Sequence, residues 1–291
     1  MRTRGDGPKA LLFLAPSLLV FALFVFFPLA FSGMLSLTKW DLLSGERPFA
    51  GLGNYARLFS DKVFLKALAN TALFSLVVVA AAAAAGLALA LALDKPIFGR
   101  AAYRAGIFAP YLTSTAAMAL VWLWIFDPQY GLINSALSRL GIAGPAWIAS
   151  IDWALPALMI MTVWRFAGYD MLLFLGGLQG VPRELKEAAY IDGAGKARIF
   201  FRITLPLLSP TTLFVVVTTF ITMFQNFETV AVMTQGGPVN STNMLVFYLY
   251  QNAFQFYEAG YASAIASVLF AIVVAATALQ MWASKRWVHY A

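Results

Sequence analysis

The sequence predicts an all-α integral membrane protein, and three observations lead to that fold class. Hydrophobic residues make up 61% of the 291 residues, and charged residues make up 11%, against about 25% in soluble domains. The mean hydropathy is +0.77. Six apolar stretches are long enough to cross a hydrocarbon core of about 30 Å, which takes about 20 helical residues. We expect six transmembrane helices in one domain over residues 1–291, at about residues 11–35, 68–93, 105–126, 155–178, 205–229 and 261–282.

The first stretch follows Arg2, Arg4 and Lys9, as a secretory signal peptide would. Its apolar run is too long for a signal peptide and no small-residue cleavage site follows, so we expect it to remain as a helix. Most of the 20 Lys and Arg residues lie at the two ends of the chain and in the loops after the second and fourth stretches. The positive-inside rule therefore predicts that both termini and residues 182–206 face the cytoplasm.

The composition also excludes several kinds of chemistry. Cysteine is absent and the single histidine is His289, so we expect no disulfide, no metal site and no histidine base. The sequence contains no GxxxxGK[ST] phosphate-binding loop, and no group of residues has catalytic spacing. The formal net charge of +7 follows the cytoplasmic loops, so we do not expect a nucleic acid partner.

Small residues and prolines mark features of the first three stretches. Pro16 and Pro28 are expected to kink the first helix. The segment after it is expected to be an outside loop that leads into a short interfacial helix. An alanine run followed by Gly86 allows close helix packing in the second stretch. In the third stretch Pro110 is expected to break the helix close to the hydroxyls of residues 113–115.

The fourth stretch carries two charged residues, Arg165 and Asp170. A charge within a span is unfavourable by about 2.5 to 3.5 kcal/mol on insertion scales, so these side chains are expected to face protein or a water-filled path. Their spacing of five differs from the favoured i,i+4. A direct ion pair, a snorkelling Arg165 and contact with a transported solute all remain open.

The fifth stretch is apolar until it becomes polar near its end. If it stays helical, one face presents Thr222, Gln225 or Asn226, and Thr229 together. Amide side chains both donate and accept hydrogen bonds and therefore suit sugar hydroxyls. Hydrogen bonding between helices is the competing explanation.

The most charged segment lies between the fourth and fifth stretches, at residues 182–206, with the sequence PRELKEAAYIDGAGKARIFFRITLP. Pro182 and the helix formers after it predict a short helix. Gly193 and Gly195 allow a sharp turn. A second helix from Lys196 to Ile203 is expected to end before Pro206.

This segment resembles the EAA loop of permease subunits of binding-protein-dependent ABC importers. The likeness rests on Glu-Ala-Ala at residues 187–189, a glycine at Gly193 and ITLP at residues 203–206. The longer match AAYIDGAGKARIFFRITLPLLSP resembles the carbohydrate branch, of the maltose and glycerol-3-phosphate type. By this resemblance the ATPase-coupling residues are Glu187, Ala188, Ala189, Asp192, Gly193, Ala194 and Pro206.

The resemblance implies the ABC importer type I permease fold in the inner membrane, with residues 182–206 as the cytoplasmic coupling loop. It also implies a second homologous permease, a dimer of ATPase subunits that binds ATP-Mg, and an extracytoplasmic binding protein that delivers a carbohydrate. The chain itself is then no enzyme and needs no cofactor. The substrate path that it implies contains Trp164, Arg165, Phe166, Tyr169, Gln225 and Asn226, and the polar face of the fifth stretch adds Thr222.

The alternatives differ in what the sequence should contain. A secondary carrier should show inverted repeats and buried ionisable groups, and we find no clear repeat. A membrane enzyme needs clustered acid, base or metal-binding residues, which are lacking. Within the importer reading a neutral di- or oligosaccharide is expected, with glycerol-3-phosphate or a polyol as the alternative, and the partner permease could hold part or all of the solute site.

Overall fold

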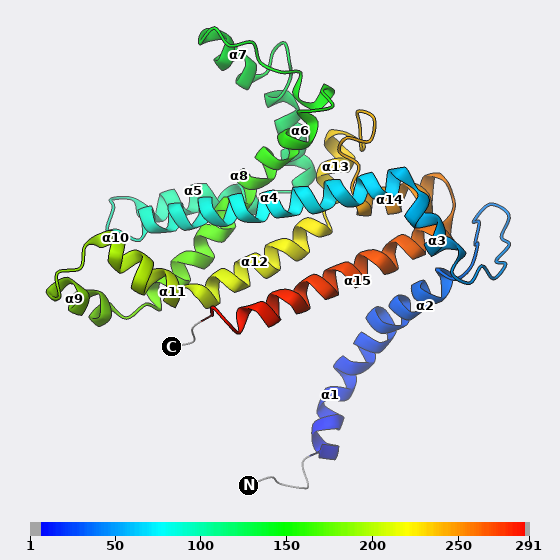
Figure 1. The fold of residues 1–291 in the computed structure, drawn as a ribbon, viewed down its shortest axis with the longest axis horizontal. Coiled ribbons are helices and arrows are strands. Elements are labelled where there is room, and N and C mark those ends of the chain that lie inside the picture. Colours follow the sequence, from blue (N-terminus) through cyan, green and yellow to red (C-terminus); the bar gives the residue numbers. More distant parts are fainter. Residues whose placement is uncertain (1–6, 289–291) are drawn as a thin grey trace. The chain divides into compact units, whose positions relative to one another are not determined.

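The computed structural model describes residues 7–288, with side chains from residue 13, and its regular elements in this range are helical (Figure 1). By length and composition, four helical runs could each cross a membrane: Phe13–Leu35, Lys62–Leu93, Ala154–Gln179 and Ala259–Ser284. Two further pairs of helices pass the same test but are sharply bent. The predicted all-helical fold class is therefore confirmed.

Contacts divide the chain into two compact units, Met1–Asp61 with Leu249–Ala271, and Lys62–Tyr248 with Ile272–Ala291. In the first unit, α1 (Gly7–Phe21) continues through a π-helical turn (Ala22–Phe26) into α2 (Phe27–Leu35), so neither Pro16 nor Pro28 ends the helix. The predicted short helix after this run is α3 (Gly53–Ser60). A second π-helical turn (Gln251–Gln255) and the start of α15 (Ala259–Ser284) complete this unit.

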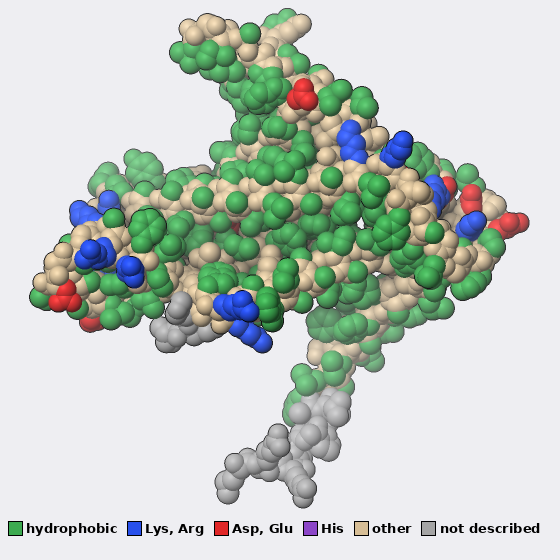
Figure 2. Space-filling model, viewed as in Figure 1, with side chains coloured by type: hydrophobic (Ala, Val, Ile, Leu, Met, Phe, Trp, Pro, Cys, Tyr) green, Lys and Arg blue, Asp and Glu red, His purple; other side chains and the backbone are tan. Residues whose placement is uncertain are grey.

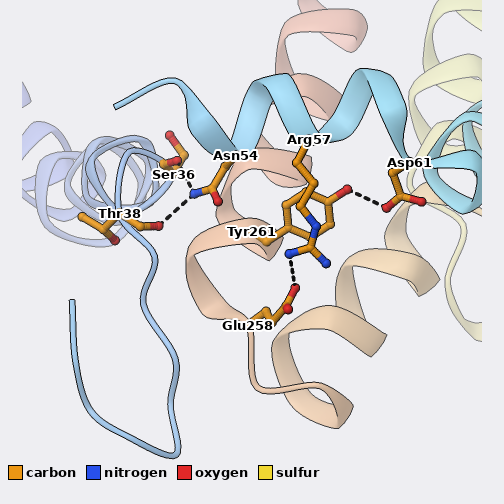
Figure 3. Close-up of polar contacts among 7 residues, drawn as sticks. All are labelled: Ser36, Thr38, Asn54, Arg57, Asp61, Glu258 and Tyr261. Atoms are coloured by element: carbon orange, nitrogen blue, oxygen red, sulfur yellow. Dashed lines mark hydrogen bonds and ion pairs between the residues drawn. The ribbon is translucent and has the colours of Figure 1, made fainter. Parts of the chain in front are cut away.

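Asn54 at the start of α3 fastens the C-terminal end of the first helical run. Its amide nitrogen donates hydrogen bonds to the backbone carbonyls of Ser36 and Thr38, both at 2.8 Å (Figure 3). The carbonyls at a helix C-terminus have no partner within the helix. One buried amide therefore fixes both the end of α2 and the position of α3.

The same face of α3 contacts the start of α15 through charged and aromatic side chains (Figure 3). Nη1 of Arg57 lies 2.6 Å from Oε2 of Glu258, and the guanidinium lies over the Tyr261 ring, 4.0 Å from its centroid. The Tyr261 hydroxyl donates to Asp61 at 2.6 Å. Residues near the two ends of the sequence thus form one polar network.

In the second unit, α4 (Lys62–Leu93) packs along α8 (Ala154–Gln179). The contact is close at Gly86, where an added Cβ would lie 2.5 Å from Cβ of Asp170. This confirms the close packing expected from the small residues of the second stretch. Buried apolar side chains form the core, including Leu93 of α4, Phe174 of α8, and Leu208, which directly precedes the helix that begins at Ser209. Hydrophobic side chains cover much of the outer face of α4, where Leu73 and Leu76 are exposed (Figure 2).

The third predicted span, residues 105–126, is broken rather than straight. It consists of α5 (Arg100–Leu112) and α6 (Thr115–Ile125), bent by 99°. Pro110 lies inside α5, and the backbone becomes extended only at Thr113. The expectation that Pro110 itself breaks the helix is therefore wrong, because the break lies about one turn after it, at Thr113. The Thr113 hydroxyl donates to the Pro110 carbonyl at 2.7 Å and caps the freed helix end.

The connection after α6 contains α7 (Leu132–Arg139) and a 3₁₀ turn (Trp147–Ala149). Asn134 organises it, because its amide donates to the carbonyls of Pro128 and Pro145 and its oxygen accepts from the Trp147 indole at 2.7 Å. This glycine- and proline-containing loop therefore has a defined conformation.

The fifth predicted span, residues 205–229, also differs from expectation. The helix that begins at Lys196 runs through α10 (Lys196–Ile199), a π-helical turn (Phe200–Thr204) and α11 (Leu205–Leu207), then bends by 62° into α12 (Ser209–Phe224). The expected helix end before Pro206 is wrong, because Pro206 lies in the first turn of α11, where its missing N–H is tolerated. The helix ends at Phe224, and α13 (Glu228–Met233) and α14 (Leu245–Tyr250) follow.

Candidate solute site and coupling segment

A cavity of about 300 Å³ lies in the second unit, where the broken third span and the end of α12 meet α8. Small-molecule sites have volumes of about 300 to 1,000 Å³, so the cavity suits a small solute or one unit of a larger one. Apolar walls come from Met161, Phe166, Met223 and Phe227. The polar lining consists of Thr115, Thr162, Arg165, Thr222, Gln225, Asn226, Glu228 and Thr229.

The end of α12 brings several of these polar groups together. The last backbone hydrogen bonds of this helix end are donated by two N–H groups. That of Gln225 donates to the Ile221 carbonyl at 3.3 Å, and that of Asn226 donates to the Met223 carbonyl at 3.2 Å. The chain then leaves the helix before α13. The prediction that one helical face presents residues 222–229 is therefore wrong, and the interruption itself places these side chains around the cavity.

Arg165 is held in the cavity wall by backbone carbonyls. Its Nη2 lies 3.4 Å from the carbonyl oxygen of Tyr111 and 3.3 Å from that of Thr113. These carbonyls are at the break between α5 and α6, where the helix no longer provides partners for them. The guanidinium also lies 5.6 Å from the Tyr111 ring centroid and 5.8 Å from that of Phe166. Its buried Nε has no hydrogen-bond partner in the structure.

Asp170 does not pair with Arg165. It is fully buried against Gly86, and one carboxylate oxygen accepts a long hydrogen bond of 3.4 Å from the Thr219 hydroxyl. Its other oxygen is buried without a partner. Of the explanations left open by the sequence, the direct ion pair is excluded in this conformation. Asp170 lies in the contact between α4, α8 and α12, outside the cavity lining.

The cavity contains most of the side chains that the sequence predicts for the substrate path. Arg165, Phe166, Thr222, Gln225 and Asn226 line it. Trp164 and Tyr169 are not among the lining residues. The Trp164 ring packs against Trp122 at 5.4 Å, and the Tyr169 ring stacks on Tyr111 at 4.4 Å.

Sequence reasoning missed Thr162 as a lining residue. It is an isolated hydroxyl in an apolar helix, and it donates to the Leu158 carbonyl of its own helix at 2.7 Å. The lone pairs of its oxygen remain available to accept, as do those of Thr222, which donates to the Thr218 carbonyl at 2.9 Å. In an isolated sequence such threonines cannot be distinguished from packing residues.

The segment 182–206 forms the predicted helix, turn and helix. Helix α9 (Arg183–Ile191) begins after Pro182, and Gly193 adopts a φ of +79°, which only glycine adopts readily. Glu187 and Ala188 are exposed, Ala189 is half-buried, and Ile191 is 87% exposed. Leu185 and Tyr190 of the same helix are also exposed, and several exposed apolar side chains on one charged helix are typical of an interaction surface.

A shallow pocket of about 480 Å³ lies beside this turn. It brings together three of the predicted coupling residues with the second helix, and its lining consists of Ala189, Asp192, Ala194, Arg198, Ile199, Arg202 and Ile203. Pro206, also predicted to take part in coupling, lines a separate pocket of about 350 Å³ with Phe201 and Trp287. Within residues 7–288, no group of three or more His, Cys, Asp and Glu side chains is placed to hold a metal ion.

Residues 82–289 match the protein family described as "Binding-protein-dependent transport system inner membrane component". The sulfoquinovosyl glycerol transport system permease protein of Agrobacterium fabrum is 37% identical over 278 residues, which cover 95% of this chain and 90% of that protein. The sn-glycerol-3-phosphate transport system permease protein of the same organism is 33% identical over 282 residues, with 96% and 95% covered.

Among solved structures, the fold is similar to a chain of a bacterial ABC transporter involved in the import of the acidic polysaccharide alginate. The TM-score is 0.82 at 22% identity, and the match covers 97% of each chain. A second structure of a bacterial alginate ABC transporter, in complex with a periplasmic protein bound to an alginate pentasaccharide, gives the same TM-score at 21% identity, with 97% of this chain and 96% of that chain covered. At such identities the likeness concerns the fold.

Proposed function

Because the chain belongs to the family of inner membrane components of binding-protein-dependent transport systems, we propose that it forms the membrane path of an ATP-driven importer for a carbohydrate. Relatives named for a sulfoquinovosyl glycerol and for glycerol-3-phosphate transport support a hydroxyl-rich solute. The observation that carries the proposal is the exposed helix and glycine turn of residues 183–193. In this proposal residues 1–291 act as one transmembrane domain.

Energy enters through a separate protein in this proposal. The chain has no phosphate-binding loop, so ATP-Mg is bound by a dimer of ATPase subunits on the cytoplasmic side, where both termini also lie. Helix α9 seats in a groove of one ATPase subunit, with Glu187 as a fixed charge and the alanines after it as a smooth contact surface. Closure of the ATPase dimer pushes α9, and the membrane helices that follow it turn with it.

The cavity described above is the solute site in this proposal. The amides of Gln225 and Asn226 donate to and accept from hydroxyl groups, threonine oxygens accept, and Arg165 donates. Interrupted helices near the middle of the membrane are frequent at solute sites of transporters, because unpaired backbone groups are tolerated where they line a cavity. A second, homologous permease closes the other side of the path, and an extracytoplasmic binding protein delivers the solute.

Affinity purification tests the proposal. The tagged full-length chain is extracted gently from its native membrane, and the proteins that remain with it are identified by mass spectrometry. We expect an ATPase and a second permease of similar length. ATP-dependent uptake of a labelled sugar is then measured in liposomes that contain the complex, with the binding protein added. Uptake by this chain alone, without ATP, would identify a secondary carrier instead.

The same preparation separates the two solute classes suggested by the relatives. The co-purified binding protein is screened against neutral sugars, polyols and glycerol-3-phosphate. Preferential binding of a neutral mono-, di- or oligosaccharide supports the proposed function. Preferential binding of glycerol-3-phosphate would instead identify this phosphate ester as the transported solute.

A further inference from the structure

The cavity carries one positive and one negative side chain, Arg165 and Glu228, and its other described lining residues are neutral. The two groups come from different elements, α8 and the start of α13, and they do not form an ion pair in this structure. The two charges therefore act on the same space without direct contact between them. Their balance determines which solutes the cavity favours.

Arg165 alone would favour an anion. Its guanidinium is fixed by the carbonyls of Tyr111 and Thr113, and its side chain is half-buried, so water screens its field only in part. A cavity with this cation as its single charge would attract phosphate, sulfonate or carboxylate groups.

Glu228 opposes that attraction. It is exposed at the first residue of α13, directly after the interruption that shapes the cavity, and it lines the same space as Arg165. An anionic solute would be attracted by one group, repelled by the other, and would lose its hydration on binding. A neutral polyhydroxyl solute can accept from Arg165 and donate to Glu228 without such a penalty.

We propose that Glu228 is a specificity-determining residue that excludes anionic solutes, so that the cavity takes neutral sugars or polyols. This inference rests on the proposed function, and it narrows the proposed solute class to neutral sugars and polyols. The competing explanation is structural, since a carboxylate at a helix N-terminus stabilises the helix.

The test compares methyl β-D-glucoside with methyl β-D-glucuronide, two probes that differ only at C6, where a carboxylate replaces the hydroxymethyl group. Apparent Kd values are obtained from the rise of the thermal unfolding midpoint of the purified importer with probe concentration, in the absence of binding protein. We expect the wild type to bind the glucoside at least tenfold more tightly. Glu228→Gln, which keeps the size of the side chain, should reduce that ratio about tenfold or reverse it.

The control is Glu258→Gln, which removes a carboxylate of the first unit that does not line this cavity. It should leave the ratio unchanged. A purely structural Glu228 would lower the unfolding midpoint of Glu228→Gln without changing the ratio, which would overturn the proposal. A wild type that prefers the glucuronide, or that binds neither probe, would also overturn it. Failure of the importer assignment would appear separately, as absence of ATP-dependent uptake.

Discussion

Gly86 of α4 lies directly against Asp170 of α8, so that a Cβ at position 86 would be 2.5 Å from the Asp170 Cβ and 2.9 Å from its backbone carbonyl carbon. Two of the obstructing atoms belong to the α8 backbone and the third is a Cβ attached directly to it, so none of them can rotate away. Asp170 is fully buried at this contact and is hydrogen-bonded to Thr219 of α12. The glycine thus sets the distance at which three helices of the second unit meet.

We predict that Gly86→Val forces α4 and α8 apart and lowers the free energy of unfolding by about 1 to 3 kcal/mol, the range for overpacked cores. The measurement is thermal or denaturant unfolding of the purified chain in detergent. Gly176→Val in α8 is the matched control, because nothing lies within 4 Å of its added Cβ. Equal stability of Gly86→Val and wild type would mean that the helices are not packed this closely.

The glycine turn after α9 gives a second prediction, which concerns coupling. Gly193 has a φ of +79°, and a side chain in that conformation is unfavourable by about 1 to 2 kcal/mol. Since no atom lies within 4 Å of its added Cβ, Gly193→Val should act on the backbone alone. We expect it to reduce solute uptake at least tenfold while ATP hydrolysis continues. Gly195→Val is the control, because Gly195 has a negative φ. This variant should retain more solute uptake than Gly193→Val.

Reversal of charge at Glu187 gives a third prediction. Glu187 is exposed on α9 and makes no described ion pair within this chain. Glu187→Arg should therefore leave the folded chain intact and uncouple ATP hydrolysis from uptake, measured in the reconstituted complex. Glu184→Arg, near the start of the same helix, is the comparison. Unchanged uptake in Glu187→Arg would remove this residue from the coupling surface.

The ion pair in Figure 3 allows a fourth prediction, through a double-mutant cycle. The side chains of Arg57 and Glu258 are 49% and 38% exposed, so their coupling energy should be small, about 0.2 to 1 kcal/mol. The unfolding midpoint is measured for the wild type, for Arg57→Met, for Glu258→Gln and for the double variant. Added salt should reduce the coupling further. A coupling energy above about 2 kcal/mol would show that the pair is far less hydrated than its exposure indicates.

A fifth prediction concerns the cavity. Asn226→Leu keeps the approximate volume of the side chain but removes its hydrogen-bonding groups, so solute uptake should fall about tenfold or more while the chain still co-purifies with its partners. Thr218→Val is the control, because the Thr218 hydroxyl donates to the Phe214 carbonyl of its own helix and does not line the cavity. If both variants transport equally, Asn226 does not contact the solute.

Local signals in the sequence were sufficient for the start of α9 and for the turn at Gly193, but not for the end of the second helix, which runs past Pro206. Pro182 can only begin a helix, and Gly193 is the residue type that a left-handed turn requires, so both boundaries follow from single residues. The apolar stretches likewise indicated where the membrane helices lie, because a length of about 20 residues is fixed by bilayer thickness, but they did not indicate the bends in the third and fifth spans.

The cavity could not be predicted in the same way. Gln225 and Asn226 are tolerated in helices, so nothing local indicates that α12 ends at Phe224. The partners of Arg165 are backbone carbonyls more than 50 positions earlier in the chain, and they are free only because the third span is broken. Contacts between distant parts of the chain therefore determine both the shape of the cavity and the hydrogen-bond partners of Arg165.

Arg57 and Glu258 are 201 residues apart in the sequence. At a synthesis rate of about 5 to 20 residues per second, Glu258 leaves the ribosome about 10 to 40 s after Arg57. During that interval the first helix already exists, while the residues that fasten α3 to the start of α15 have not been made. Maturation of the first unit therefore has to wait until translation is nearly complete.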